Sequence, residues 1–209
     1  MTIQKGQDWG HYVARPNRLH LVANDREAGN YLNQHLSGAN PPLEIAILKS
    51  EMARTLGVSG ANIKKSEMLR TEFDVVEATF ELDDSKVRER RYFLGHAFIR
   101  SGWFRGGTVG VLNSSFVGRR DWAPRSHPND GKFDVIEFDA SISIRQRLTA
   151  YRLMKSGSHL PHPNIRHRQM TQYSADCIES STLYIESNRV GIVKSCIFSV
   201  LPDAVVLYW

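Results

Sequence analysis

The stretch Ala123-Pro-Arg-Ser-His-Pro-Asn-Asp-Gly-Lys-Phe-Asp-Val135 joins a proline-rich approach, an Asn-Asp-Gly turn and the start of an apolar run. Asn129, Asp130 and Gly131 tolerate the left-handed backbone of tight turns, so they predict a sharp corner that leads directly into a strand. The simpler interpretation of this corner is a turn between two strands. The alternative is a hard-cation site, in which the Asp130 carboxylate and nearby backbone carbonyls bind Mg²⁺ or Ca²⁺.

Short runs with period-two alternation surround this corner, and they are typical of an antiparallel β-sandwich. The predicted strands are Asp74–Leu82, Arg91–Arg100, Thr108–Asn113, Phe133–Phe138, Ile165–Thr171, Leu183–Glu186, Gly191–Val200 and Ala204–Tyr208. One helix interrupts them, because Ser143 can cap a helical segment that ends at Gly157. The inward face of this helix is expected to carry Ile144, Leu148, Tyr151 and either Leu153 or Met154.

The N-terminal part has a different pattern, in which strands and helices alternate. We expect a strand over Arg18–Ala23, a capping box from Asn24 to Glu27, a buried strand over Leu43–Leu48, and a helix over Ser50–Leu56 closed by Gly57. The composition changes near Ser59 to Ser66. We therefore expect an α+β protein, with a small α/β segment over residues 1–65 and a mainly antiparallel β-sandwich with one inserted helix over 66–209.

Composition limits the size of the fold and the class of partner. The 209 residues, 41% of them hydrophobic, can bury the core of one domain or of one domain with a small extension. Twenty-seven Lys and Arg residues against 22 Asp and Glu give a net charge of +5. This excess favours an anionic partner, and nucleic acid, anionic lipid headgroups and nucleotide phosphates all qualify. A mildly basic surface without such a partner is the simpler alternative.

The sequence favours a cytoplasmic location. Cys177 and Cys196 are the only cysteines and are far apart in sequence, which favours reduced thiols over a disulfide framework or a zinc site. The first ten residues lack the apolar region of a secretory signal, and no apolar run reaches the roughly 20 residues that span a bilayer. Any membrane contact is therefore expected to be peripheral. The Trp103-Phe104-Arg105 segment could enter a lipid interface, although a buried hairpin end is the simpler interpretation.

The order of segments from about Val109 to Tyr208 resembles the C-terminal β-sandwich half of the bacterial diacylglycerol kinase-like lipid kinases. The resemblance rests on Ala123-Pro-Arg125 with Asn129-Asp-Gly131, the helix that follows, Gly157-Ser-His159 with His162-Pro163, and Pro202-Asp-Ala204 near the end. It implies that Asp130 holds a structural Mg²⁺, with backbone oxygens near His127 and Lys132 as co-ligands.

Two departures from that family concern the chemistry. The Gly-Gly-Asp-Gly-Thr loop that cradles the ATP phosphates in these kinases is not found, and the nearest equivalent reads Lys49-Ser50-Glu51. The family's Asp-Gly-Glu segment, whose Glu is the general base, corresponds to Glu186-Ser187-Asn188. An Asn amide has no useful basicity, so Asn188 cannot replace the base. Glu186 is a weak surrogate candidate, because a turn at this point would aim its side chain elsewhere.

Arginines near the corner are candidates for binding phosphate. Arg119 and Arg120 precede the turn, and their guanidinium groups could clamp a phosphate near a metal at Asp130. Arg125, in the Ala-Pro-Arg motif, is a third candidate. The simpler interpretation of every basic cluster in this chain is a solvated face.

The leading hypothesis is therefore a lipid-kinase-like protein that binds an anionic lipid or nucleotide and does not by itself hold a complete kinase active site. It would be a pseudo-kinase or a split-kinase subunit completed by a partner chain, and its sheet edges make a homodimer plausible. Mg²⁺ is then a structural cofactor, and ATP an open one. The first alternative is an active lipid kinase with a diverged nucleotide loop and Glu186 as base. The second is a basic nucleic-acid-binding module, which is disfavoured because the aromatic residues are not interleaved with Lys and Arg.

Overall fold

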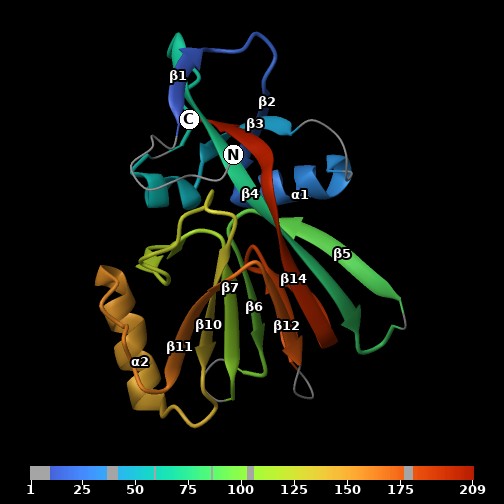
Figure 1. Ribbon diagram of the computed structural model, residues 1–209, viewed down its shortest axis with the longest axis vertical. Coiled ribbons are helices and arrows are strands. Elements are labelled where there is room, and N and C mark those ends of the chain that lie inside the picture. Colours follow the sequence, from blue (N-terminus) through green and yellow to red (C-terminus); the bar gives the residue numbers. More distant parts are fainter. Residues whose placement is uncertain (1–9, 37–41, 59, 86, 103–105, 177–180) are drawn as a thin grey trace.

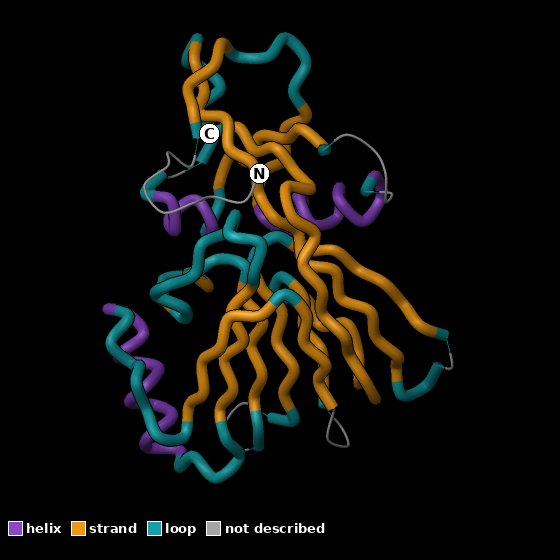
Figure 2. The backbone as a smooth tube through the Cα atoms, in the orientation of Figure 1, coloured by secondary structure: helices purple, strands orange, loops and turns teal. Residues whose placement is uncertain are grey.

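The computed structural model describes residues 10–36, 42–58, 60–85, 87–102, 106–176 and 181–209. It confirms the expected α+β fold, with a small α/β part and an antiparallel β-sandwich. Figures 1 and 2 show the small part above and the sandwich below, joined by two long strands that run through both. These are β4 (Glu67–Leu82) and β14 (Asn188–Tyr208), which pair antiparallel.

The upper part contains a small sheet with one helix against it. Its elements are β1 (His11–Ala14), β2 (His20–Asn24), α1 (Asp25–His35), β3 (Leu43–Lys49) and the 3-10 helix η1 (Met52–Leu56). Strands β2 and β3 are parallel, and β3 is also parallel to the end of β14. The predicted capping box is present in a shifted form, because the Asn24 side chain accepts from the Glu27 N–H while the Glu27 carboxylate accepts from the Ala23 N–H.

The sandwich consists of two facing layers. One layer contains β5 (Arg88–Phe93), β4, β14 and β12 (Gln172–Asp176). The other contains β13 (Thr182–Ile185), β6 (His96–Arg100), β7 (Thr108–Leu112), β10 (Phe133–Phe138) and β11 (Ile165–Met170). A separate two-stranded ribbon pairs β8 (Phe116–Val117) with β9 (Arg120–Asp121). Phe80, Phe93 and Phe198 are among the buried side chains that fill the space between the layers.

The second layer is apolar on both of its faces. In β10, Phe133 and Val135 belong to the core between the layers, whereas Ile136 and Phe138 belong to a cluster on the opposite face. Helix α2 (Ile144–Leu153) and the 3-10 turn η2 (Met154–Ser156) cover that opposite face. Figure 1 shows α2 beside β11 at the flank of the sandwich. The predicted helix is thus a third layer, and Gly157 ends it in the left-handed conformation.

Four predicted elements differ from the folded chain. The strand expected over Asp74–Leu82 starts earlier, because β4 begins at Glu67. The expected strand Arg91–Arg100 is divided into β5 and β6 at Leu94-Gly95. The two expected strands at the end are one, since β14 continues through a bulge at Pro202-Asp203 instead of stopping there. The segment after β3 forms a 3-10 helix rather than an α-helix.

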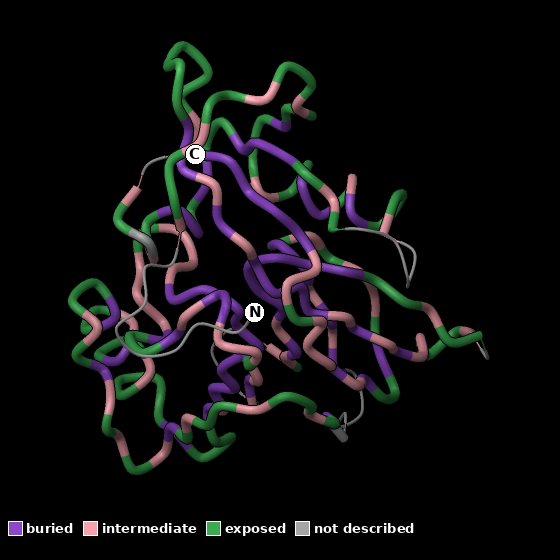
Figure 3. The backbone as a smooth tube through the Cα atoms, turned by 45° about the horizontal axis from the view of Figure 1, so that its top comes forward, coloured by how far each residue is buried: buried purple, intermediate pink, exposed green. Residues whose placement is uncertain are grey.

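The core of the upper part includes residues from the two long strands. Phe73 of β4 and Leu207 of β14 pack with Leu32 of α1 and Ile45 of β3. Figure 3 shows the buried backbone concentrated along the central strands, with exposed backbone at the rim. The α/β segment expected over residues 1–65 therefore completes its sheet and its core with strands from the rest of the chain.

None of the helices in the described part of the chain is long and apolar enough to cross a membrane. Cys196 is buried and forms no disulfide within the described residues. Cys177 and the Trp103-Phe104-Arg105 segment lie outside the described residues.

Candidate functional site

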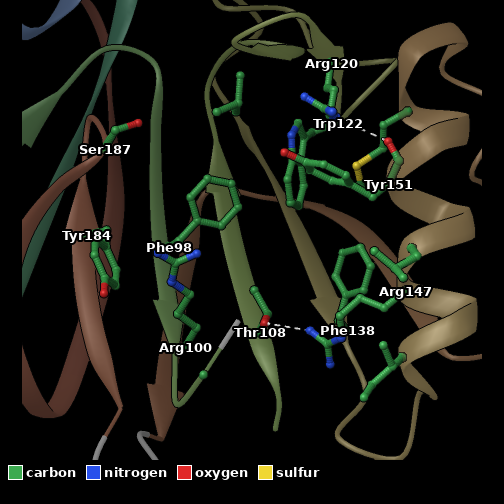
Figure 4. A pocket seen from close by; sticks show the side chains of 15 residues that line it. Phe98, Arg100, Thr108, Arg120, Trp122, Phe138, Arg147, Tyr151, Tyr184 and Ser187 are labelled. Atoms are coloured by element: carbon green, nitrogen blue, oxygen red, sulfur yellow. Dashed lines mark hydrogen bonds between the residues drawn. The ribbon is translucent and has the colours of Figure 1, made fainter. Parts of the chain in front are cut away.

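A pocket of about 420 Å³ lies between helix α2 and the outer face of the second layer (Figure 4). Its lining residues include Phe98, Val117, Trp122 and Phe138 on one side and Ile144, Leu148, Tyr151 and Met154 on the helical side. The helical face therefore points as the sequence predicts. Ile144 and Leu148 are nevertheless each 43% exposed, because α2 stands off the sheet. An apolar pocket of this size falls in the range of small-molecule and lipid sites, roughly 300–1,000 Å³.

Arginines project into the walls of this apolar pocket. Arg120 lies 3.6 Å from the ring centre of Tyr151, and its Nε donates to the Tyr151 carbonyl at 3.3 Å. Arg147 donates to the Gly106 carbonyl, and its own Nε is buried without a hydrogen-bond partner in the described part of the chain. Burial lowers the pKa of Arg147 from its ordinary value. Positive charge at the edge of an apolar cavity is suited to an amphiphile with an anionic end.

The wall opposite α2 ends in a strained hairpin. Tyr184 and Ser187 line the pocket there, and Arg100 lies 4.2 Å from the ring centre of Tyr184 (Figure 4). Glu186 and Ser187 connect β13 to β14 with φ angles of 46° and 63°. A two-residue turn of this kind normally carries Asn-Gly, and two ordinary residues in the left-handed region cost roughly 1–2 kcal/mol each. Strain of this kind is commonly kept where it positions functional side chains.

This hairpin aims the Glu186 carboxyl into the interior. One carboxyl oxygen, Oε1, accepts from the Leu94 and Gly95 N–H groups at 3.1 and 2.7 Å, which explains the break between β5 and β6. A Cβ on Gly95 would lie only 3.1 Å from the other oxygen, Oε2. Burial raises the pKa of Glu186 to about 8, and the negative charges of Asp25 and Glu51 contribute to this rise. Glu186 is therefore a structural part of the interior as well as a titratable group.

His96 links Glu186 to the pocket. Its Nε2 lies 3.1 Å from the Ser187 hydroxyl, and its Nδ1 lies 3.6 Å from Glu186 Oε2. Burial lowers the pKa of His96 to about 4, so the imidazole is neutral at physiological pH. Ser187 is exposed, whereas His96 and Glu186 are buried. The sequence does not indicate a role for His96 or Ser187, because their proximity depends on the pairing of β6 with β13.

The loop after β3, which the sequence predicts as the counterpart of a nucleotide loop, is held by hydrogen bonds to the chain's own side chains. The Asp25 carboxylate accepts from the Glu51 N–H at 2.8 Å, and the Ser50 hydroxyl accepts from the Ala53 N–H. The Glu51 carboxylate in turn accepts from the Gly118 N–H at 2.6 Å. Backbone donors here are thus engaged by carboxylates and a hydroxyl. The carboxylates of Asp25 and Glu51 therefore both lie at this loop.

The Asn129-Asp-Gly corner is held from inside by Asp74. The two oxygens of this buried carboxylate accept from the Gly131 and Asp203 N–H groups at 2.7 and 3.0 Å. Burial raises the pKa of Asp74 to about 6, and the charges of Asp203 and Asp130 act in the same direction. Asp74 thus joins the corner to the β14 bulge. The sequence offers one signal for this role, which is an acidic residue within the apolar run around Phe73 and Val75.

The residues of the predicted metal site, Asp130, His127 and Lys132, belong to this corner. Asp130 accepts from the Lys132 N–H at 3.0 Å, and the His127 ring accepts from the Asn129 N–H at 3.2 Å. The buried amide oxygen of Asn129 has no hydrogen-bond partner in the described ranges, and such an oxygen is a donor type that hard cations accept. Within the same ranges, no three His, Cys, Asp or Glu side chains converge as a metal cluster.

The three arginines predicted to bind phosphate do not lie in one place. Arg119 and Arg125 are exposed, whereas Arg120 is partly buried against Tyr151 in the pocket. The contacts of Arg120 thus belong to the pocket beneath α2. The sequence missed the pocket itself, because the helical pattern predicts which face points inward but not how far the helix stands from the sheet.

Known proteins resemble this chain in fold rather than in sequence. No family model matches the sequence, and no curated protein does. Two solved structures described as diacylglycerol kinases of Bacillus anthracis str. Sterne are similar to this chain. One has a TM-score of 0.65 at 14% identity and aligns over 90% of this chain and 77% of its own. The other has a TM-score of 0.57 at 14% identity, over 90% and 74%. The chain thus has a diacylglycerol kinase-like fold.

Proposed function

We propose that this protein binds an acyl lipid with an anionic headgroup in the pocket beneath α2 and is not, by itself, a complete lipid kinase. The observation that carries the proposal is the open apolar pocket with arginines in its walls. Each CH₂ group buried there contributes about 0.8 kcal/mol. Ile144 and Leu148 gain burial when a chain fills the space.

The headgroup assignment rests on the charge distribution around this pocket. Arg147 offers a buried N–H without a partner among the described residues, and a charge-assisted bond to an anion would satisfy it. Arg100 and Arg120 add positive charge on the other walls. A neutral lipid would use the apolar walls only, so an anionic lipid should bind more tightly.

The kinase part of the proposal rests on the loop after β3 and on the hairpin. Asp25 and Glu51 would repel the ATP phosphates, and their oxygens already engage the local N–H groups. Glu186 is buried and held by two backbone donors, and Asn188 cannot act as a base. These features support a pseudo-kinase or a subunit whose nucleotide site is completed by a partner chain. A nucleic-acid module gains no support, because Trp122 lines the pocket and Trp209 is buried.

A fluorescently labelled lysophosphatidic acid tests the lipid site directly. Leu148→Trp places a larger ring in the pocket and should weaken binding about tenfold or more, the loss expected from roughly 1.4 kcal/mol. Leu153→Trp is the matched control, because Leu153 is 41% exposed on the same helix and is not among the lining residues. Equal affinity of both variants and the wild type would contradict the site.

Competition with unlabelled lipids tests the headgroup. Lysophosphatidic acid should displace the probe better than a monoacylglycerol of the same chain length. Arg100→Met should reduce this preference, whereas Arg145→Met should leave it unchanged, since Arg145 is exposed and is not a lining residue. A preference for the neutral lipid would refute an anionic headgroup.

Mg²⁺ at the Asp130 corner is the second component of the proposal. Asp130, with the amide oxygen of Asn129 and nearby backbone oxygens, would hold the ion, which would neutralise charge between Asp74 and Asp130. Thermal unfolding should show stabilisation by Mg²⁺, about 2.7 kcal/mol at one hundred times its Kd. Asp130→Ala should abolish the effect, and Asp84→Ala, at an exposed position, should retain it.

The same experiment with ATP tests the kinase part. ATP should add no further stabilisation, and the isolated protein should not phosphorylate lipid above background. ATP-dependent phosphorylation that is lost in Glu186→Gln would instead support an active kinase with a diverged loop.

A further inference from the structure

We infer that Ser187, His96 and Glu186 form a hydrolytic relay that cleaves a long-chain carboxylic ester bound in the pocket beneath α2. The inference goes beyond lipid binding and rests on the proposed function only in that the same pocket holds the acyl chain. The Ser187 hydroxyl contacts His96 Nε2 at 3.1 Å, and His96 Nδ1 faces Glu186 Oε2 at 3.6 Å. A nucleophile, a base and a group that orients the base are therefore arranged in series.

The three side chains differ in solvent exposure, in the order that a serine hydrolase requires. Ser187 is exposed and lines the pocket, so a bound ester can reach its hydroxyl. His96 and Glu186 are 6% and 8% exposed, so the base and its orienting carboxyl are shielded from water. Figure 4 shows Ser187 and Tyr184 on the wall opposite α2. An acyl chain lying between this wall and the helix would place its ester group beside the hairpin.

The backbone fixes this arrangement. The Glu186 N–H donates to the His96 carbonyl at 3.0 Å, and the neighbouring residues Ile185 and Ala97 are paired between β13 and β6. The left-handed φ angles of Glu186 and Ser187 let these adjacent side chains reach opposite sides of one imidazole. An Asn-Gly turn would be less strained and would remove both functional groups.

The distance of 3.6 Å between Nδ1 and Oε2 exceeds that of a hydrogen bond. Catalytic hydrogen bonds are often this long without substrate and shorten when it binds. The Glu186 oxygen that faces His96 is not the one that accepts from Leu94 and Gly95. It is therefore available to the imidazole.

The reaction follows the usual course of acyl transfer to serine. His96 Nε2 takes the proton as Ser187 Oγ forms a bond to the ester carbonyl carbon, and the C–O bond to the alcohol breaks as His96 returns the proton to the departing oxygen. Water then attacks the acyl-serine with His96 again as base. The products are an alcohol and a carboxylic acid, Ser187 is regenerated, and no redox change occurs.

The protonation state of Glu186 decides which nitrogen of His96 carries the proton, and therefore whether His96 can accept the proton of Ser187. The side chains that act on it are Asp25 from α1, Glu51 before η1, and His96 from β6. When Glu186 is ionised, it accepts from His96 Nδ1–H and leaves Nε2 free to take the serine proton. When Glu186 is protonated, the opposite tautomer is favoured and the hydroxyl is not activated. Hydrolysis should therefore rise as the pH increases through about 8.

The first test uses diisopropyl fluorophosphate, a probe too small to depend on the acyl pocket. Mass spectrometry of the intact chain and its peptides should locate the adduct on Ser187. Ser187→Ala should remove the labelling, and Ser141→Ala, at an exposed serine outside the pocket, should not. Absence of an adduct on folded wild-type protein would overturn the relay.

The second test measures hydrolysis of p-nitrophenyl octanoate against pH. Ser187→Ala should reduce the rate to background. Glu186→Gln should lower it about 10²-fold and abolish the rise near pH 8, a change that a purely structural role would not produce. An unchanged rate in Ser187→Ala would refute the proposal.

The two proposals fail in distinguishable ways. Lipid binding without any adduct would eliminate the relay alone, whereas an adduct on Ser187 with no lipid binding would eliminate the proposed function alone.

Discussion

At the scale of single residues, the buried Glu186 carboxyl makes the free energy of unfolding depend on pH. Its pKa rises from 4.5 in the unfolded chain to about 8 in the folded one, so its contribution is complete below pH 4.5 and is lost as the pH rises toward 8. His96 acts in the opposite direction, because its pKa falls from 6.5 to about 4 and its contribution is lost as the pH falls below 6.5. Above pH 6.5 the contribution of Glu186 therefore remains unopposed by His96.

We expect the midpoint temperature of thermal unfolding to decrease as the pH rises from 6.5 to 8, because Glu186 titrates in this range and His96 does not. One titrating group changes the free energy of unfolding by at most about 1.4 kcal/mol per pH unit. Glu186→Gln cannot ionise and should lack this decrease. Glu67→Gln, at an exposed position, is the control and should behave as the wild type. A decrease of equal size in both variants would mean that another group titrates.

The local residue pattern predicts the Asn129-Asp-Gly corner, because turn preference is a property of neighbouring residues. It cannot predict that Asp74 supports the corner, because Gly131 is 57 positions away. The sequence also indicates that a turn would redirect Glu186. Its burial against Leu94 and Gly95 depends on strand pairing, and that pairing is not encoded locally.

At the scale of elements, the start of helix α2 is well specified. Ser143 Oγ accepts from the Gln146 N–H, and the Gln146 side chain accepts from the Ser143 N–H, which completes a capping box. Ala150 is the only buried residue of this helix in the described part of the chain, and Arg147 donates hydrogen bonds from it to the Gly106 carbonyl and the Thr108 hydroxyl. The helix that borders the pocket is therefore held by its cap, by η2 and by the hydrogen bonds of Arg147 rather than by close packing.

Ser143→Ala should destabilise the helix by about 1 kcal/mol, which corresponds to roughly fivefold faster local amide exchange. Hydrogen exchange of the α2 amides measures this directly. Ser141→Ala, two residues earlier and outside the helix, should change the exchange little. Unaltered α2 exchange in Ser143→Ala would show that the cap does not limit opening.

Element types are predicted better than their ends. The alternation from Arg91 to Arg100 continues through Leu94-Gly95, so no change of pattern marks the break that the Glu186 carboxyl imposes. At the other end, Pro202 suggests a stop because it lacks an N–H. The strand continues there, because a bulge absorbs the proline and the Asp203 N–H is satisfied by Asp74.

At the scale of the whole molecule, the two parts share strands rather than meeting at an interface. Phe73 and Leu207 complete the core of the upper part, whereas Phe80 and Phe198 on the same two strands fill the sandwich. The sequence predicts both parts from their periodicities. It does not predict the sharing, because periodicity reports which face of a strand is buried and not which element covers it.

The central place of β14 has a consequence for how the chain acquires its structure during synthesis. Among the described residues, every other helix and strand precedes β14 in the sequence, yet β14 pairs with β3, β4, β12 and β13. Until the ribosome has made β14, β4 lacks its main partner, and the cores of the upper part and of the sandwich both lack the side chains of β14. We therefore expect the nascent chain to collapse into stable structure only late, and to depend on chaperones until then.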